Sequence, residues 1–191
     1  MANDNQIYIV VDIEADGPTP GLHSMLSLAA VATTSKKEIS RFYEKVVPLP
    51  DAVSDPNTVE WWKGQPEAWE EVNRNQKTPT SVLKEFCVWL DLLNAEPIFV
   101  ASPIGLDYTF VSWYLFRFAR RNPFMNDKNA IRTLDIRSYI AGKYGLSFNE
   151  SSRDNLPAEL TDGMPEHTHR AIDDAAGYAF LLRKLLSDTS D

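Results

Sequence analysis

The alternation of apolar and polar blocks along the chain predicts five strands. The run 7–11 is continuous, apolar and β-branched, which is typical of a strand buried on both faces of a sheet. Residues 26–33 and 38–47 predict the second and third strands, and their short connections indicate an antiparallel meander. Residues 97–102 and 130–136 predict the fourth and fifth strands.

Capping residues and helical periodicity predict the helices between and after these strands. Asp55-Pro56, Pro66 and Thr78-Pro79 each fit the start of a helix, with proline in its first turn. Three further helices are predicted by spacing of apolar residues, over 106–121, 138–144 and 170–187. The polar segment 145–168 between the last two predicts a loop. Strands followed by helix-linked strands predict an α/β fold with one central mixed sheet.

Length and composition indicate one domain spanning residues 1–191. With 43% hydrophobic residues the chain can bury one well-formed core. No apolar run reaches 18 residues and no secretory signal is visible, so we expect no membrane span and a cytoplasmic setting. The single cysteine, Cys87, lies in a helical apolar pattern and is expected to pack rather than to form a disulfide.

The charge balance limits the kinds of nucleic-acid binding that fit the sequence. A formal net charge of −8 argues against a broad basic surface for nucleic acid. It still allows a nucleic-acid enzyme in which metal ions and a few basic side chains supply local positive charge.

Two acids follow the first strand directly and are the first candidates for chemistry. Asp12 and Glu14 are two residues apart, so their side chains lie on one face of the strand. Two carboxylates this close repel each other, and a bound cation would relieve the repulsion. A solvated turn explains the same residues equally well, because residues 17–21 have the composition of a loop.

Two more acids are predicted to face the sheet from helices. Asp107 lies on the apolar stripe of the helix that follows the fourth strand, and Asp174 lies within the apolar face of the last helix. Asp173 is expected to point to solvent, where an acid in a first turn is favoured by the helix dipole. Four such carboxylates call for about two divalent cations, and oxygen ligands favour Mg²⁺ or Mn²⁺ over Zn²⁺. Two ions in one site are suited to hydrolysis of phosphodiesters.

A histidine begins the helix that carries Asp174. His169 is placed to accept a proton from the attacking water, and His167 is the second candidate for that role. His23 is interpreted as a loop residue.

These motifs together resemble the DnaQ-like 3′–5′ exonucleases, the DEDDh branch of the RNase H-like fold. The family has Asp-x-Glu ending the first strand, an Asp opening a middle helix, and His-x-x-x-x-Asp at the start of the last helix. The resemblance extends from residue 7 to residue 186, with the motifs in the same order. It implies Asp12, Glu14, Asp107 and Asp174 as metal ligands, and His169 as general base. It also implies release of nucleoside 5′-monophosphates from the 3′ end and a five-stranded mixed sheet in the order 3-2-1-4-5.

The sequence departs from the family pattern after Glu14, where the family often has a threonine and this chain has Ala15 and Asp16. A hydroxyl contact to the terminal nucleotide is lost there, and Asp16 is expected to add negative charge near the metals. The stretch Glu60-Trp61-Trp62 with a following Gln65 is similar to the ribonuclease group RNase AS. This likeness favours single-stranded RNA over DNA as the partner and allows a homodimer. The expected substrate-binding residues are Ala15, Asp16, Met25, Glu60, Trp61 and Trp62.

The two adjacent tryptophans are expected to have different environments. Successive helical residues point about 100° apart, so one ring should enter the core while the other faces the groove. Trp61 is favoured as the exposed ring, stacking on an unpaired base near the 3′ end.

The sequence leaves three other functions open. A DNA exonuclease of repair or proofreading has the same motifs. A catalytically silent nucleic-acid-binding or protein-interaction module on the same fold is disfavoured by the presence of all five motif residues. A glycosidase is disfavoured because the acids come as four with a histidine rather than as one pair.

Overall fold

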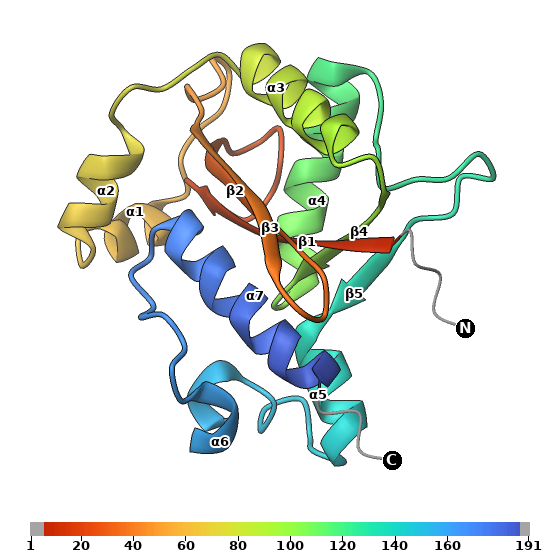
Figure 1. Cartoon of the computed structure of the whole chain (residues 1–191). Helices are drawn as coiled ribbons and strands as arrows, with labels where there is room; N and C mark the ends of the chain where they lie inside the picture. The colour runs from red at the N-terminus through yellow and green to blue at the C-terminus, as the bar shows by residue number, and fades with distance from the viewer. Residues whose placement is uncertain (1–5, 188–191) are drawn as a thin grey trace.

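The computed structural model describes residues 6–187, and within this range it contains one five-stranded mixed sheet in the predicted order β3-β2-β1-β4-β5 (Figure 1). Strands β1 (Gln6–Ala15), β2 (Met25–Thr33) and β3 (Glu38–Lys45) form the antiparallel meander. Strands β4 (Glu96–Ala101) and β5 (Thr133–Asp135) continue the sheet in parallel with β1. The two ends of the predicted domain, residues 1–5 and 188–191, lie outside the described residues.

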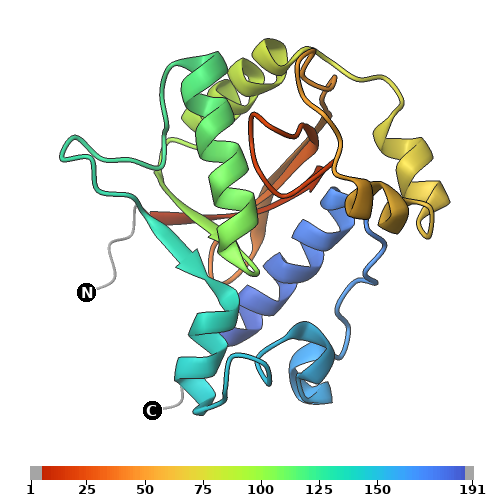
Figure 2. The same ribbon diagram turned by 180° about the vertical axis from the view of Figure 1, so that it is seen from behind.

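Helices cover both faces of this sheet, as Figures 1 and 2 show from opposite sides. One core lies between the sheet and helices α3 (Pro79–Leu92) and α4 (Ile104–Tyr114), and a second core lies between the sheet and α5 (Ile136–Tyr144) and α7 (Ala171–Ser187). Alternate residues of β1 enter the two cores, with Ile9 and Val11 in the first and Val10 in the second. Burial on both faces explains why β1 is apolar without interruption.

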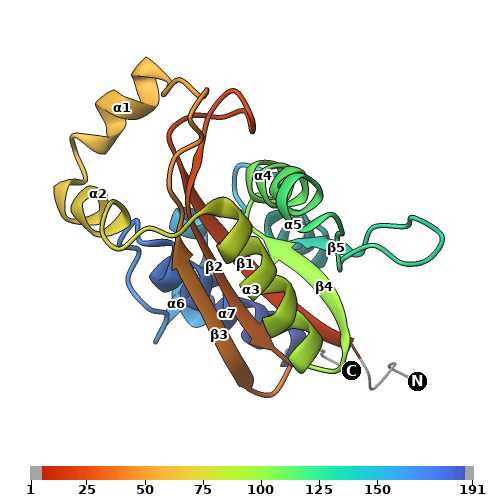
Figure 3. The same cartoon turned by 90° about the horizontal axis from the view of Figure 1, so that it is seen from above.

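Two short helices project from the sheet on the side where β1 ends (Figure 3). Helix α1 (Pro56–Trp62) begins as predicted, because the Asp55 carboxylate accepts a hydrogen bond from the backbone N–H of Thr58 at 2.9 Å. Helix α2 (Pro66–Val72) also begins with proline. In Figures 1 and 2 both helices lie near the N-terminal end of α7.

The structure differs from the prediction mainly at the ends of elements. Helix α4 ends at Tyr114 and is followed by a π-helix, Leu115–Ala119, which stops at Arg120 in the left-handed conformation (φ 60°). Strand β5 is shorter than predicted at both ends. At its C-terminal end the Asp135 carboxylate accepts the Ser138 N–H at 2.6 Å, which starts α5 directly.

The predicted loop 145–168 also contains short helical turns, a 3₁₀ turn at Arg153–Asn155 and helix α6 at Ala158–Thr161. Over residues 6–187, no helix is both long enough and apolar enough to span a bilayer.

Candidate active site

The candidate site lies where β1 continues beyond its parallel neighbour. The β1–β4 pairing ends at Val10, whereas the pairing of β1 with β2 continues past Asp12 and Glu14. The backbone around these two acids is therefore held by β2 on one side, and the other side is left for residues from the helices. This is the carboxyl end of a parallel strand pair, where α/β sheets commonly bind ligands.

Helices α4 and α7 bring two further acids to this place, as predicted. Asp107, in the first turn of α4, accepts a hydrogen bond from the backbone N–H of Ile13 at 3.0 Å, so it is fixed between Asp12 and Glu14. Asp174, in the first turn of α7, is only 2% exposed. Carboxylate oxygens of Asp12, Glu14 and Asp174 lie within 4.8 Å of one another.

Burial and mutual repulsion disfavour the charged forms of these acids. Burial raises the pKa of Asp12 well above its usual range, and the charges of Asp107, Glu14 and Asp174 raise it further. The pKa of Glu14 is raised well above its usual range by burial first and then by Asp174 and Asp107. Burial also raises the pKa of Asp107, to about 7, although the Ile13 N–H opposes this shift.

The carboxylates fit a divalent-metal site. Asp12, Glu14, Asp107 and Asp174 offer only oxygen ligands, which suits Mg²⁺ or Mn²⁺. The pKa values of Asp12 and Glu14 are raised by burial first and then by the neighbouring negative charges, and a bound cation would favour the charged carboxylates against both effects. These four residues are therefore the ones that would hold the metal ions.

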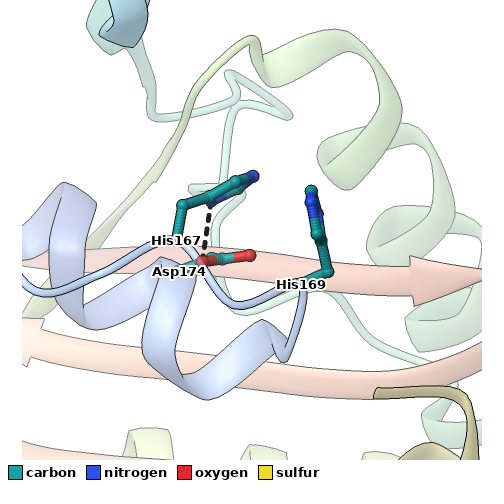
Figure 4. A group of neighbouring side chains, drawn as sticks. All are labelled: His167, His169 and Asp174. Atoms are coloured by element: carbon teal, nitrogen blue, oxygen red, sulfur yellow. Dashed lines mark ion pairs between the residues drawn. The ribbon is translucent and has the colours of Figure 1, made fainter. Parts of the chain in front are cut away.

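Both candidate histidines lie beside Asp174 (Figure 4). His167 Nδ1 is 2.8 Å from Asp174 Oδ1, and the His167 and His169 rings lie 4.4 Å apart at 72°. His169 adopts a left-handed conformation (φ 56°) at the residue where the chain turns toward α7. Partial burial and the neighbouring His167 lower the pKa of His169, which favours the neutral imidazole that a proton acceptor requires.

The two neighbouring acids of α7 are separated as predicted. Asp174 faces the carboxylate cluster, whereas Asp173 is only partly buried and accepts a hydrogen bond from the Thr168 hydroxyl at 2.8 Å. Asp173 also lies 3.5 Å from the guanidinium of Arg170. These contacts give Asp173 a role at the start of the helix.

The two tryptophans have the different environments that helical geometry predicts. Trp62 is buried, and its Nε1 donates a hydrogen bond to the Ala15 carbonyl at 3.1 Å. Trp61 is 44% exposed, and its ring lies 5.1 Å from the His169 ring at 88°. The exposed ring thus borders the candidate base, and its contact with substrate stays a prediction.

Two of the expected substrate-binding residues have structural environments instead. The side chain of Met25 is fully buried in the core beside α3 and α4, so it presents no surface to a substrate. The Asp16 carboxylate is buried and accepts hydrogen bonds from the Ser24 N–H at 2.5 Å and the Ser54 hydroxyl at 3.0 Å. These two donors hold the Asp16 carboxylate in its loop, and its expected effect on the metal site stays a prediction.

The remaining expected contacts are not tested by their surroundings. Ala15 lies at the end of β1, and Glu60 is exposed and forms an ion pair with Lys63. His23, interpreted as a loop residue, is buried in its loop and accepts the Thr19 N–H at Nδ1 (3.0 Å).

Two charged residues near the site had no signal in the sequence. The positive charge of Arg153 lowers the pKa of Asp12, opposing the acids, and Glu71 of α2 raises the pKa of Glu14. Arg153 belongs to the polar segment 145–168, where no periodicity assigned it a direction. Glu71 accepts hydrogen bonds from Tyr43 and Lys45 of β3, a contact between elements that are not adjacent in the chain.

Comparisons with known proteins place this fold among exonucleases. The chain is 26% identical over 189 residues to the 3′–5′ DNA exonuclease Cap18 of Escherichia coli, covering 96% of this chain and 93% of Cap18. The nuclease domain of 3′hExo, a DEDDh family member bound to rAMP, superposes with a TM-score of 0.73 at 15% identity, covering 99% of this chain and 96% of that one. E. coli Exonuclease I in complex with a dA16 oligonucleotide has a TM-score of 0.67 at 17% identity, and covers 97% of this chain and 41% of that one.

These likenesses confirm the RNase H-like fold and the resemblance to DEDDh exonucleases. That family depends on divalent metal ions, which fits the carboxylate cluster. The narrower likeness to RNase AS stays a prediction. The sequence model of the Exonuclease family matches residues 9–181, a range that includes all four acids and both histidines. The chain therefore belongs to the Exonuclease family.

Proposed function

We propose that this chain is a 3′–5′ exonuclease that hydrolyses single-stranded nucleic acid and releases nucleoside 5′-monophosphates. The observation that carries the proposal is the convergence of Asp12, Glu14, Asp107 and Asp174 from one strand and two helices, with His169 beside them. The 26% identity to a 3′–5′ DNA exonuclease over nearly the whole chain supports the same polarity.

Each residue has a distinct part in the proposed reaction. Two Mg²⁺ or Mn²⁺ ions bound by the four acids would stabilise negative charge at the reacting phosphate and promote ionisation of the attacking water. His169 accepts the proton of that water, since its lowered pKa keeps the imidazole neutral near pH 7. Asp107 also fixes the backbone between Asp12 and Glu14 through the Ile13 N–H.

The substrate class is proposed from two observations that favour different sugars. The Cap18 relative acts on DNA and covers the whole site, which supports DNA as the first candidate. The exposed Trp61 in its Glu60-Trp61-Trp62 context supports RNA as the second. In both cases Trp61 would stack on an unpaired base, so a single strand is preferred.

The test uses single-stranded DNA and RNA of one sequence, each carrying a label at the 5′ end. With Mg²⁺ or Mn²⁺ we expect a ladder of labelled products that shortens from the 3′ end, and mononucleotide 5′-phosphates as the released product. If labelled mononucleotide were the first product, degradation would start at the 5′ end and the proposed direction would be wrong. Cleavage of a circular single strand, which has no end, would indicate an endonuclease. The ratio of the initial rates of hydrolysis on the two strands shows whether the enzyme prefers DNA or RNA.

Neighbouring acids provide a matched pair of variants for the same assay. Asp174→Asn removes a proposed metal ligand and should abolish hydrolysis, whereas Asp173→Asn keeps the acceptor for the Thr168 hydroxyl and should have a mild effect. An active Asp174→Asn with an inactive Asp173→Asn would contradict the proposed ligand set.

His169→Ala should slow turnover by about 10²–10⁴-fold, the usual contribution of a general base. Binding of metal and single strand should change little, and a full loss of metal binding would contradict the assignment. The homodimer that the resemblance allows is tested by light scattering of the purified chain.

A further inference from the structure

We propose that His167, His169 and Asp174 form a binding site for Zn²⁺ that shares Asp174 with the carboxylate cluster, and that Zn²⁺ bound there inhibits the enzyme. Binding of the ion follows from the three side chains alone. Inhibition rests on the proposed function, because it requires His169 and Asp174 to act in hydrolysis.

The ligand atoms of the three side chains lie close together. One ligand atom from each lies within 4.8 Å of the others, and His167 Nδ1 is 2.8 Å from Asp174 Oδ1. Figure 4 shows both imidazoles on the same side of the first turn of α7, with the Asp174 carboxylate between them. A tetrahedral Zn²⁺ with bonds of about 2.0–2.2 Å needs only small adjustments to accept these atoms.

The ligand chemistry distinguishes this set from the carboxylate cluster. Two imidazole nitrogens and one carboxylate oxygen are a common zinc set, and the fourth position is left for water. Mg²⁺ prefers oxygen ligands and keeps part of its water shell, so the nitrogen atoms of His167 and His169 select against it.

The surroundings hold the ligands and leave the site accessible. Asp174 is 2% exposed, and its Oδ1 also accepts the Thr168 N–H at 3.2 Å, so the carboxylate is fixed from behind. The side chain of His167 is 42% exposed, which gives an ion a route from solvent. The edge-to-face contact with Trp61 restricts the ring of His169.

Asp174 belongs to both ligand sets, which links zinc binding to activity. The Asp174 carboxylate lies close to His167 and His169, and it also lies close to the carboxylates of Asp12 and Glu14. Zn²⁺ on the histidine side therefore binds the imidazole of His169, the proposed proton acceptor, and alters one ligand of the carboxylate set. We expect Zn²⁺ to inhibit hydrolysis that Mg²⁺ supports.

The binding test is calorimetric titration of Zn²⁺ into the full, untagged chain, with Co²⁺ absorption as a second readout of tetrahedral coordination. His167→Ala should weaken Zn²⁺ binding by at least about tenfold, since even residues that only support a ligand contribute that much. His167→Gln is measured in parallel in case the alanine variant folds poorly. Glu14→Gln, which changes only the carboxylate cluster, and Asp173→Asn should bind Zn²⁺ as the wild type does.

The proposed site would be overturned if both His167 variants bound Zn²⁺ with wild-type affinity. It would also be overturned if only Glu14→Gln lost affinity for Zn²⁺, because the ion would then occupy the carboxylate cluster.

The second experiment measures inhibition, and the rate of each variant with Zn²⁺ is compared with its own rate in Mg²⁺ alone. Zn²⁺ should inhibit the wild type at concentrations at least tenfold below those needed for the His167 variants. Zinc binding without exonuclease activity would overturn the proposed function and leave the metal site standing, so the two failures are distinguishable.

Discussion

Asp107 combines two roles that oppose each other in the metal-free protein. Its carboxylate anchors the Ile13 N–H between two other acids, yet burial raises its pKa to about 7. A group whose pKa is raised on folding stabilises the protein fully below its unfolded pKa, near 3.8. That contribution is lost as the pH rises through about 7. At pH 8 the metal-free fold therefore carries an unfavourable charge at Asp107.

The variant Asp107→Asn separates these roles. The amide oxygen can still accept the Ile13 N–H, so the anchor is kept while the charge is removed. We expect the Tm in EDTA to rise at pH 8 and to change little at pH 5, where the wild-type carboxyl is already protonated. The further rise in Tm that Mg²⁺ or Mn²⁺ gives the wild type should shrink, and hydrolysis should be lost. A lower Tm at pH 8, or an equal gain at both pH values, would contradict this account.

Single residues were predictable where periodicity assigned them a direction. The helical face of α7 separated Asp174 from Asp173, and the alternation of β1 placed Asp12 and Glu14 together. Met25 was assigned to substrate although its side chain is buried, because a residue at the start of a strand carries no sign of which face it occupies. The two hydrogen-bond partners of Asp16 had no signal in the sequence, because Ser24 lies eight residues and Ser54 38 residues further along the chain.

At the scale of elements, helix α1 sets one tryptophan in the core and one at the site. Trp62→Ala removes a buried ring and the hydrogen bond to the Ala15 carbonyl, so we expect a loss of about 3–5 kcal/mol in the free energy of unfolding. Trp61→Ala should leave the Tm nearly unchanged and raise the KM for a single strand. Loss of one stacked base costs about 1–3 kcal/mol, which is roughly 5–150-fold.

Chemical unfolding and KM on one oligonucleotide measure both tryptophan effects. Trp62→Phe is the control for volume, since it fills most of the space without the N–H donor. If both alanine variants unfold easily and KM stays constant, the two rings are core residues and Trp61 has no role in stacking.

Glycine 177 in helix α7 makes room for the segment that precedes the helix. A Cβ there would lie 3.1 Å from Arg153 Nη1 and 3.3 Å from Met164 Cε. The Arg153 guanidinium is held by the Pro165 carbonyl at 2.6 Å, and its charge acts on Asp12. His167 and His169 follow Met164 closely in the chain, so a displacement of Met164 is expected to move the two histidines of the candidate active site.

Gly177→Ala should therefore lower kcat several-fold with little change in Tm. The gain in helix propensity, about 1 kcal/mol, offsets the strain of moving Arg153 and Met164. Gly142→Ala in α5 is the matched control, because a Cβ there meets no atom within 4 Å. It should stabilise the fold without changing activity. Equal kinetics of the two variants would remove any role for the Arg153 contact in the site.

Elements with strong periodicity were predictable, and those set by distant contacts were not. The five strands followed from apolar runs and short connections, and their order followed from the resemblance to a known family. The π-helix after Tyr114 and the turns within 145–168 had no pattern of their own. Their conformations depend on contacts such as that of Arg153 with α7, which join parts of the chain that are far apart in sequence.

For the whole molecule, the balance of charge predicts how binding responds to salt. The net charge of −8 repels a polyanion, and the basic residue found to act on Asp12 is Arg153. Affinity should then come from metal ions and base stacking more than from release of counterions. A protein that neutralises about three phosphates of a single strand has a slope of log affinity against log salt near −2, and we expect a slope no steeper than this here.

The measurement is binding of an uncleavable single strand between 50 and 200 mM KCl at fixed Mg²⁺ concentration. We expect a slope no steeper than about −2, and a parallel line of lower affinity for Trp61→Ala, because stacking carries no charge. Omitting Mg²⁺ should reduce affinity more than the whole range of salt does, since the acids would then face the phosphates unneutralised. A slope steeper than about −4 would require a basic surface that contacts many phosphates, and would contradict a binding site organised around metal and aromatic contacts.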